Sequence, residues 1–313
     1  MKICLSIAAW DDAFREMREQ LERVAEVEVV GLDGYSLKGT DIFIGKKMSE
    51  ATLTGADSLK AVFAYKTGVD DFPLRAFRER GILLINSHVN SGYIAEYAFA
   101  LSLALVTRVA QFDKAMRRGD WMTADPHWRS LLSMKVGLAG YGSIGRAIDR
   151  LLRMNKISTY TMDRGKEYEG VNKVASLEEL CRTCDLIIAS LPSTKETDGV
   201  FSREILQSMR GKFLVNVGRS NCIDEAALYS ALKDGVLAGA AIDTWRQKPA
   251  TGQKDFYPYD FPFHELDNVL LSSHKAMQIA DGHEKYVKDT LYSVLRYLNG
   301  EPLSSVVDLT KGY

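Results

Sequence analysis

The stretch VGLAGYGSIG at residues 136–145 decides the fold of this chain, because it matches the GxGxxG pattern in the expected setting. The four apolar residues 136–139 predict a strand, and residues 146–154 predict a helix. A second predicted strand ends at Asp163, which is 163 − 145 = 18 residues beyond Gly145. That spacing is close to the about 20 residues typical of a dinucleotide-binding βαβ unit.

Each part of this loop has a physical task. Gly140 permits a tight turn, Gly142 lets the backbone approach a pyrophosphate, and Gly145 allows close packing of helix on strand. A helix that begins here presents N–H groups and a positive dipole end to phosphates. Asp163 would bind both ribose hydroxyls and repel a 2′-phosphate, which favours NAD, whereas the neighbouring Arg164 leaves NADP open.

Short apolar runs alternate with helical segments along the whole chain, which predicts parallel sheets covered on both faces. The predicted strands are residues 3–8, 27–31, 41–45, 61–64 and 82–86, and then 136–139, 158–162, 186–190, 213–217, 238–242 and 269–272. The predicted helices include 12–26, a single long helix over 94–116, and 284–298, and an irregular segment covers 117–133. We expect a fold of two doubly wound α/β domains, one flavodoxin-like and one of Rossmann type, with a cleft between them.

The C-terminal helix is too short to form a domain alone, so we expect it to return to the N-terminal domain. This predicts a discontinuous substrate-binding domain, residues 1–95 with 284–313, and an NAD-binding domain at 96–283.

Composition restricts the possible partners. The 40 Lys and Arg residues balance 41 Asp and Glu residues, so no basic field predicts binding to nucleic acid or to a membrane surface. A hydrophobic content of 46% argues against disorder, and the longest charge-free apolar run, 97–107, is too short to span a bilayer. Four cysteines, including the pair Cys181 and Cys184, and five scattered histidines give no disulfide framework and no metal site, which predicts a cytoplasmic location.

Three later strands are followed by residues of useful chemistry: Arg219, Asp243 and His274. Ligands of doubly wound sheets bind beyond the carboxyl ends of the strands. A histidine transfers protons near neutral pH, and an arginine binds a carboxylate with two hydrogen bonds. The three residues together indicate a nicotinamide-dependent enzyme that acts on a carboxylic acid.

The chain resembles the D-isomer-specific 2-hydroxyacid dehydrogenase superfamily over essentially its whole length. Within it, the length and the ending are most similar to the glyoxylate/hydroxypyruvate reductase A group. The motifs that carry the resemblance are KAVFA at 60–64, TGVD at 67–70, AEY at 95–97, the glycine loop, LPST at 191–194, NVGR at 216–219, DEAAL at 224–228, AGAAID at 238–243, and NVL at 268–270 before His274.

The resemblance implies a role for each matching residue. Arg219 would clamp the substrate carboxylate, His274 would be the general acid/base, and Asp243 would contact the nicotinamide carboxamide. It implies a homodimer formed through the coenzyme domain. Backbone N–H groups around Thr67, Gly68 and Val69 would hold the substrate carboxylate, and the remaining coenzyme-binding residues would be Ser143, Ile144, Leu191, Pro192, Val217 and Gly218. Lys66 and Asn90 are further candidate substrate-binding residues.

Three lysines depart from the family pattern. Lys248 stands where the family usually has the glutamate that pairs with the histidine, Lys66 replaces a frequent glycine, and Lys275 replaces a small residue. A cation near His274 should lower the pKa of that histidine. The lysines are either solvated surface charges or a pocket for a second anionic group of the substrate. Asp281 and Glu284 are candidates to replace the missing glutamate.

The sequence therefore predicts hydride transfer between NAD(H) and a small anionic 2-keto or 2-hydroxy acid, with the particular acid and the direction left open. Two alternatives remain. Asn90 with Ser91, and DTW at 243–245, resemble formate dehydrogenases, and the missing glutamate fits a non-catalytic NAD(H)-sensing interaction protein. The aromatic-rich segment 249–262 is expected to be an ordered loop near the site.

Overall fold

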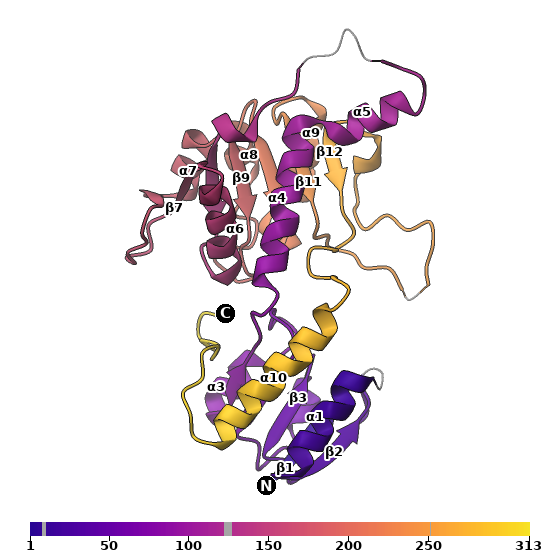
Figure 1. Ribbon diagram of the computed structural model, residues 1–313, viewed down its shortest axis with the longest axis vertical. Helices are drawn as coiled ribbons and strands as arrows, with labels where there is room; N and C mark the ends of the chain where they lie inside the picture. Colours follow the sequence, from indigo (N-terminus) through magenta and orange to yellow (C-terminus); the bar gives the residue numbers. More distant parts are fainter. Residues whose placement is uncertain (8–10, 122–126, 251) are drawn as a thin grey trace. The chain divides into compact units, whose positions relative to one another are not determined.

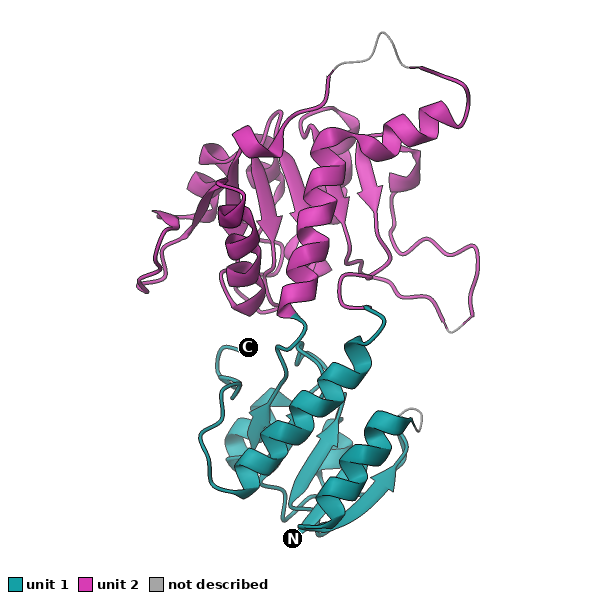
Figure 2. Ribbon diagram, viewed as in Figure 1, with its two compact units in different colours: residues 1–90, 279–313 teal, residues 91–278 magenta. Residues whose placement is uncertain are grey.

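The computed structural model describes residues 1–7, 11–121, 127–250 and 252–313. Ala8 of the first predicted strand, residues 122–126 of the irregular segment and residue 251 of the aromatic segment lie outside these ranges. The chain divides into two compact units, residues 1–90 with 279–313 and residues 91–278 (Figure 2). The predicted junctions lie five residues further along, since 95 − 90 = 5 and 283 − 278 = 5.

Unit 1 (residues 1–90 and 279–313) is built on one parallel sheet. Its strands are β1 Lys2–Ser6, β2 Glu26–Val30, β3 Ile42–Gly45, β4 Ala61–Ala64 and β5 Leu83–Ile85, in the order β2-β1-β3-β4-β5. This is the flavodoxin-like order, and every residue of β3 and β4 is buried, as expected for a sheet covered on both faces. The helices are α1 Asp12–Glu22, α2 Glu50–Leu53, α3 Leu74–Arg80 and α10 Gly282–Leu298, and α1 lies beside α10 (Figure 1).

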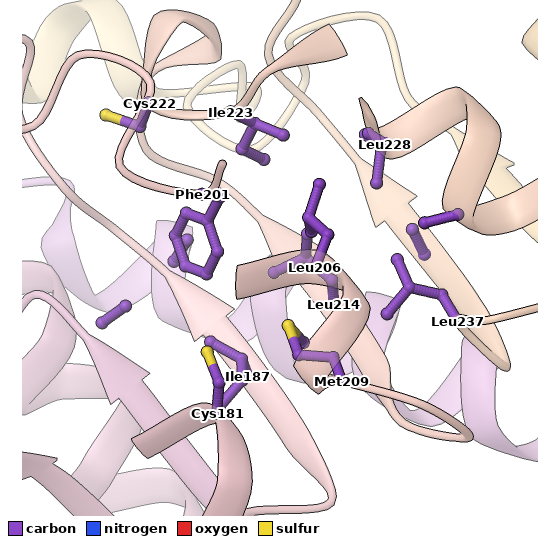
Figure 3. Packing of buried hydrophobic residues seen from close by; sticks show 14 of the residues in the cluster. Cys181, Ile187, Phe201, Leu206, Met209, Leu214, Cys222, Ile223, Leu228 and Leu237 are labelled. Carbon is purple, nitrogen blue, oxygen red and sulfur yellow. The ribbon is translucent and has the colours of Figure 1, made fainter. Parts of the chain in front are cut away.

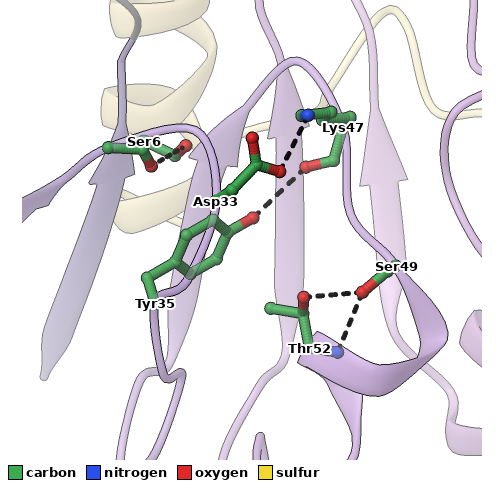
Figure 4. A network of polar contacts seen from close by, with 7 residues as sticks. Ser6, Asp33, Tyr35, Lys47, Ser49 and Thr52 are labelled. Atoms are coloured by element: carbon green, nitrogen blue, oxygen red, sulfur yellow. Dashed lines mark hydrogen bonds and ion pairs between the residues drawn. The ribbon is translucent and has the colours of Figure 1, made fainter.

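Polar contacts hold the segment that follows β3 (Figure 4). Lys47 Nζ lies 2.8 Å from Asp33 Oδ1, and the Tyr35 hydroxyl donates to the Lys47 carbonyl at 3.4 Å. Ser49 caps α2 by accepting the Thr52 N–H at 3.1 Å. These contacts fix the chain at the carboxyl end of β3.

Unit 2 (residues 91–278) contains a larger parallel sheet. Its strands are β6 Lys135–Ala139, β7 Ser158–Met162, β8 Asn172–Val174, β9 Leu186–Ala189, β10 Phe213–Asn216, β11 Gly239–Ile242 and β12 Val269–Leu271, in the order β12-β11-β10-β9-β6-β7-β8. The order reverses between β9 and β6, which makes that pair the topological switch point. The helices are α4 Ser91–Thr107, α5 Val109–Met116, α6 Ser143–Met154, α7 Leu177–Thr183, α8 Arg203–Ser208 and α9 Glu225–Lys233.

Alternating side chains of this sheet fill two separate cores. Leu186 and Ile188 of β9 pack with α4 and α6, whereas Ile187 packs with α7, α8 and α9. Figure 3 shows the second core, where Phe201 and Met209 lie with Ile187. Helices on both faces explain why the strands read as continuous apolar runs.

Three of the four cysteines lie in the second of these cores, and Cys4 lies in the core of unit 1. All four are buried with free thiols, and burial raises the pKa of Cys4, Cys181 and Cys184 to about 12. Cys181 and Cys222 lie in the core drawn in Figure 3. They are therefore packing residues with little thiolate at neutral pH.

Three sequence-based predictions of elements are wrong in detail. The helix predicted over 94–116 is two helices, because Arg108 adopts a left-handed φ of 57° and interrupts it. The axes of α4 and α5 differ by 60°. The strand β8 was not predicted, because it has only three residues and two of them are polar. It adds a seventh strand to the six expected in this sheet. The helix predicted over 12–26 ends at Glu22, because Glu26 already belongs to β2. Across the described ranges, no single helix is long and apolar enough to cross a membrane, and only α4 and α5 counted together as a bent pair meet that test.

Candidate functional site

The glycine loop lies at the switch point between β6 and β9. Gly140 has a φ of 100°, and its carbonyl accepts the Ser190 hydroxyl at 3.1 Å. A Cβ on Gly145 would lie 2.1 Å from the Gly140 oxygen, so the first turn of α6 packs directly on the loop. The tasks predicted for Gly140 and Gly145 match this geometry.

In contrast to Gly145, Gly142 faces open space, because a Cβ added there would have no heavy atom outside its chain neighbours within 4 Å. Gly142 is the N-cap of α6 and has no side chain to cap this helix, whereas the side chains of Asp224 and Ser176 cap α9 and α7. Open space beside the backbone and a positive helix end suit a pyrophosphate. The loop thus fits a dinucleotide, with Ser143 and Ile144 in the first turn of the helix.

Tyr141 holds the loop from the side. Its hydroxyl donates to Asp149 Oδ2 at 2.7 Å, and burial raises the pKa of this phenol. Asp149 is 4% exposed and also accepts the Thr159 hydroxyl at 2.6 Å. The ring of Tyr141 meets that of Tyr168 edge to face, with centroids 4.5 Å apart. Sequence reasoning missed this network, because contacts eight or more residues apart leave no local pattern.

Asp163 follows β7 as predicted, with its side chain 50% exposed. It accepts the Gly165 N–H at 2.9 Å, and Lys173 Nζ lies 3.7 Å from the same oxygen, while Arg164 is exposed. The carboxylate is therefore accessible to a ribose.

The other predicted coenzyme residues pack against one another beside the loop. A Cβ on Gly218 would lie 2.7 Å from the Leu191 backbone nitrogen, and the Val217 N–H donates to the Ala189 carbonyl at 3.0 Å. Leu191 and Val217 are buried, and the Pro192 carbonyl accepts the Thr197 hydroxyl at 2.6 Å. These residues join the ends of β9 and β10.

Asp243 has no exposed surface, and its carboxylate receives three hydrogen bonds from the segment that carries His274. The donors are the Ser272 hydroxyl at 2.5 Å, the Lys275 N–H at 2.8 Å and the Ala276 N–H at 3.1 Å. The Asp243 carbonyl also accepts the His274 N–H at 2.8 Å. Asp243 thus positions the segment around His274, and its predicted contact with a carboxamide stays a prediction.

His274 lies in this braced segment with a left-handed φ of 57°. Burial lowers the pKa of His274 most, Asp243 opposes this effect, and the charges of Lys248 and Arg219 lower the pKa further. The effect of Lys248 has the predicted sign, although Lys248 itself is exposed. Arg219 and His274 are therefore within electrostatic reach of each other in unit 2.

An aromatic cluster supports the same segment. Trp245 donates its indole N–H to the Ser272 carbonyl at 2.8 Å, and its ring packs on Tyr259 with centroids 4.9 Å apart. Tyr257 stacks on His264 at 4.2 Å. The described part of segment 249–262 is thus connected through Trp245 to the His274 segment, a contact that the sequence does not reveal.

The predicted substrate loop of unit 1 follows β4. The Thr67 hydroxyl lies 2.8 Å from the Ser87 carbonyl and 2.9 Å from the Tyr286 hydroxyl, and the Thr67 carbonyl accepts from Asn86 Nδ2 at 2.6 Å. In the described part of the chain, the N–H groups of Thr67, Gly68 and Val69 donate to no backbone oxygen. The side chain and the carbonyl of Thr67 thus hold the loop, and these three amides take no part in its backbone hydrogen bonding.

The remaining candidate site residues differ in whether their side chains have hydrogen-bond or ion-pair partners. Lys66 pairs with Asp71, and Lys275 Nζ donates to Gln278 at 2.7 Å. Asn90 is fully buried, and neither atom of its amide has a partner among the described residues. The two acidic candidates pair with lysines of α10: Asp281 with Lys285 and Glu284 with Lys288, both at 2.6 Å.

The sheet order and the glycine loop define unit 2 as a dinucleotide-binding α/β domain. The family model of the D-isomer specific 2-hydroxyacid dehydrogenase, NAD binding domain, matches residues 99–276. The chain belongs to this superfamily, and its coenzyme is NAD or NADP.

Known proteins resemble the chain over most of its length. It is 29% identical over 320 residues to the D-3-phosphoglycerate dehydrogenase of Methanocaldococcus jannaschii, covering 97% of this chain and 60% of that protein. It therefore spans less than two thirds of that relative. It is 26% identical over 309 residues to the glyoxylate reductase of Pyrococcus furiosus, covering 94% and 87%. A crystal structure of a Pyrococcus horikoshii protein matches with a TM-score of 0.85 at 27% identity, covering 98% of this chain and 95% of that one.

The glycine loop gives a matched pair of substitutions. We expect Gly145→Ala to lower the free energy of unfolding by about 3 kcal/mol, because its Cβ would overlap the Gly140 carbonyl. Gly142→Ala should cost less than about 1 kcal/mol and weaken NADH binding about tenfold, the effect of one lost charge-assisted hydrogen bond. Urea unfolding and fluorescence titration measure the two effects, and equal destabilisation by both variants would contradict this account.

Asp243→Asn tests whether the Asp243 carboxylate holds the segment around His274 in place. An amide in place of this buried carboxylate turns one acceptor into a donor that faces N–H groups, so stability should fall by about 2 kcal/mol. Because the charge of Asp243 raises the pKa of His274, its removal should also lower that pKa, which NMR titration of the imidazole measures. Asp224→Asn, which keeps a good helix cap, is the control and should change stability by less than about 0.5 kcal/mol. A similar small effect at Asp243 would refute its positioning role.

Proposed function

We propose that the protein transfers a hydride between NAD(P)H and a small 2-keto acid of the glyoxylate or hydroxypyruvate class. The observation that carries this proposal is that Arg219, Asp243 and His274 follow the neighbouring strands β10, β11 and β12 of a dinucleotide-binding sheet. A base and a carboxylate clamp at that edge are what hydroxyacid chemistry requires.

Arg219 would bind the substrate carboxylate with two hydrogen bonds and stabilise negative charge that develops on the keto oxygen. When bound, the coenzyme supplies the hydride that reaches the keto carbon. His274 donates the proton that the same oxygen needs to become a hydroxyl.

The relatives support this substrate class without choosing within it. One is a glyoxylate reductase, whose substrate carries one carboxylate, and another acts on phosphoglycerate, which carries a second anionic group. The lysines at 66, 248 and 275 keep both types of substrate in consideration. Formate oxidation and non-catalytic NAD(H) sensing are the alternative outcomes of the tests below.

His274→Asn tests the assigned proton donor. Asparagine tolerates the left-handed backbone of this position, so the variant should fold. With glyoxylate or hydroxypyruvate and NADH, we expect kcat to fall by about 10²- to 10⁴-fold, whereas NADH binding should change less than about twofold. The readout is NADH absorbance, with formate and NAD as a parallel assay. Undiminished turnover would exclude this mechanism, and turnover of formate alone, or of no substrate, would favour the alternatives.

Lys248→Ala tests the unusual cation. Its removal should raise the pKa of His274, because Lys248 lowers it, and reduction requires the protonated form. The high-pH limit of kcat should therefore move to higher pH, whereas Lys248→Arg should leave it in place. If Lys248 or Lys66 reads a second anionic group, each alanine variant should raise KM about tenfold for a dianionic 2-keto acid only. An unchanged pH profile and unchanged KM values would make these lysines surface charges.

We also propose that the protein is a cytoplasmic homodimer formed through unit 2. Val109, Met116 and Trp121, on and just after α5, are 54%, 53% and 76% exposed, and an exposed apolar group of this kind suits a second copy of the chain. Sedimentation equilibrium should give twice the chain mass, and Met116→Glu with Val109→Glu should reduce it to that of one chain. A monomeric wild type would end this part of the proposal.

A further inference from the structure

Lys173 lies beside the carboxylate expected to bind the coenzyme ribose. It belongs to β8, in register with Thr161 of β7, and its Nζ lies 3.7 Å from Asp163 Oδ1. The Asp163 N–H donates to the Val174 carbonyl at 2.8 Å, so strand pairing fixes the two side chains near each other.

A second carboxylate, that of Glu167, is the nearer partner of Lys173 but is far more exposed than Asp163. Glu167 Oε1 lies 2.9 Å from Nζ, yet the Glu167 side chain is 96% exposed, and exposed ion pairs contribute little. Lys173 itself is 23% exposed and keeps its place beside Asp163. Glu167 and Asp163 both raise the pKa of Lys173, so its charge is retained.

A carboxylate at the end of this strand repels the 2′-phosphate of NADPH and accepts the 2′-hydroxyl of NADH. An ammonium within 4 Å offsets that negative charge. We propose that Lys173 is a coenzyme-selectivity residue, which neutralises Asp163 and so admits NADPH beside NADH. This inference rests on the proposed function, because it concerns the coenzyme of the same site.

Equilibrium titration of the full chain with NADH and with NADPH at low salt tests it without any substrate. We expect Lys173→Met, which keeps the aliphatic stem, to raise the ratio of the NADPH Kd to the NADH Kd about fivefold. Lys173→Arg should keep the wild-type ratio. Lys166→Met, which removes an exposed cation of the neighbouring loop, is the matched control and should change the ratio less than about twofold. Thermal melting checks that the variants are folded.

Asp163→Asn identifies the route of the effect. If Lys173 acts by neutralising Asp163, Lys173→Met should change the ratio less than about twofold in the Asp163→Asn background. A full effect in that background, an unchanged ratio in Lys173→Met, or an equal effect of Lys166→Met would each overturn the inference. If the variants bind coenzyme with an unchanged ratio of the two Kd values, the inference fails and the proposed function stands. If the wild type binds neither NADH nor NADPH, both the inference and the proposed function fail.

Discussion

The buried carboxylate of Asp243 is the group on which the candidate site depends. A charge without exposed surface is costly unless hydrogen bonds replace its water, and here three donors from one short segment do so. That segment includes His274, whose left-handed backbone costs about 1 kcal/mol for a residue with a Cβ. The two features depend on each other. The left-handed backbone at His274 places the N–H donors beside Asp243, and their hydrogen bonds to the Asp243 carboxylate stabilise that backbone.

The surroundings of His274 determine which protonation state of its imidazole is favoured before a substrate binds. Burial, Lys248 and Arg219 all lower the pKa of His274, so the neutral imidazole is favoured near neutral pH. Neutral histidine is the form that accepts a proton during oxidation of a hydroxy acid. An anionic substrate bound to Arg219 would offset the positive charges and raise the pKa, so that binding itself would favour the protonated form needed for reduction.

Local patterns predicted the parts of the molecule whose causes are local. The apolar runs of β4 and β9 and the glycine loop each lie within a few consecutive residues, and the structure forms them where they were expected. The break at Arg108 has no glycine or proline to indicate it, and β8 is too short and too polar to show a period. The brace from Asp243 joins residues about thirty positions apart, and no spacing rule connects them.

The two ends of the proposed coenzyme site differ in how easily they can change. Around His274 the geometry depends on backbone N–H groups that donate to one buried carboxylate, so that replacing Asp243 leaves those N–H groups unpaired. Around Asp163 it depends on the half-exposed carboxylate and the side chains of Lys173 and Glu167, which contribute little to stability. On the proposed role of Lys173, single surface substitutions near Asp163 change coenzyme preference without disturbing the backbone geometry around His274.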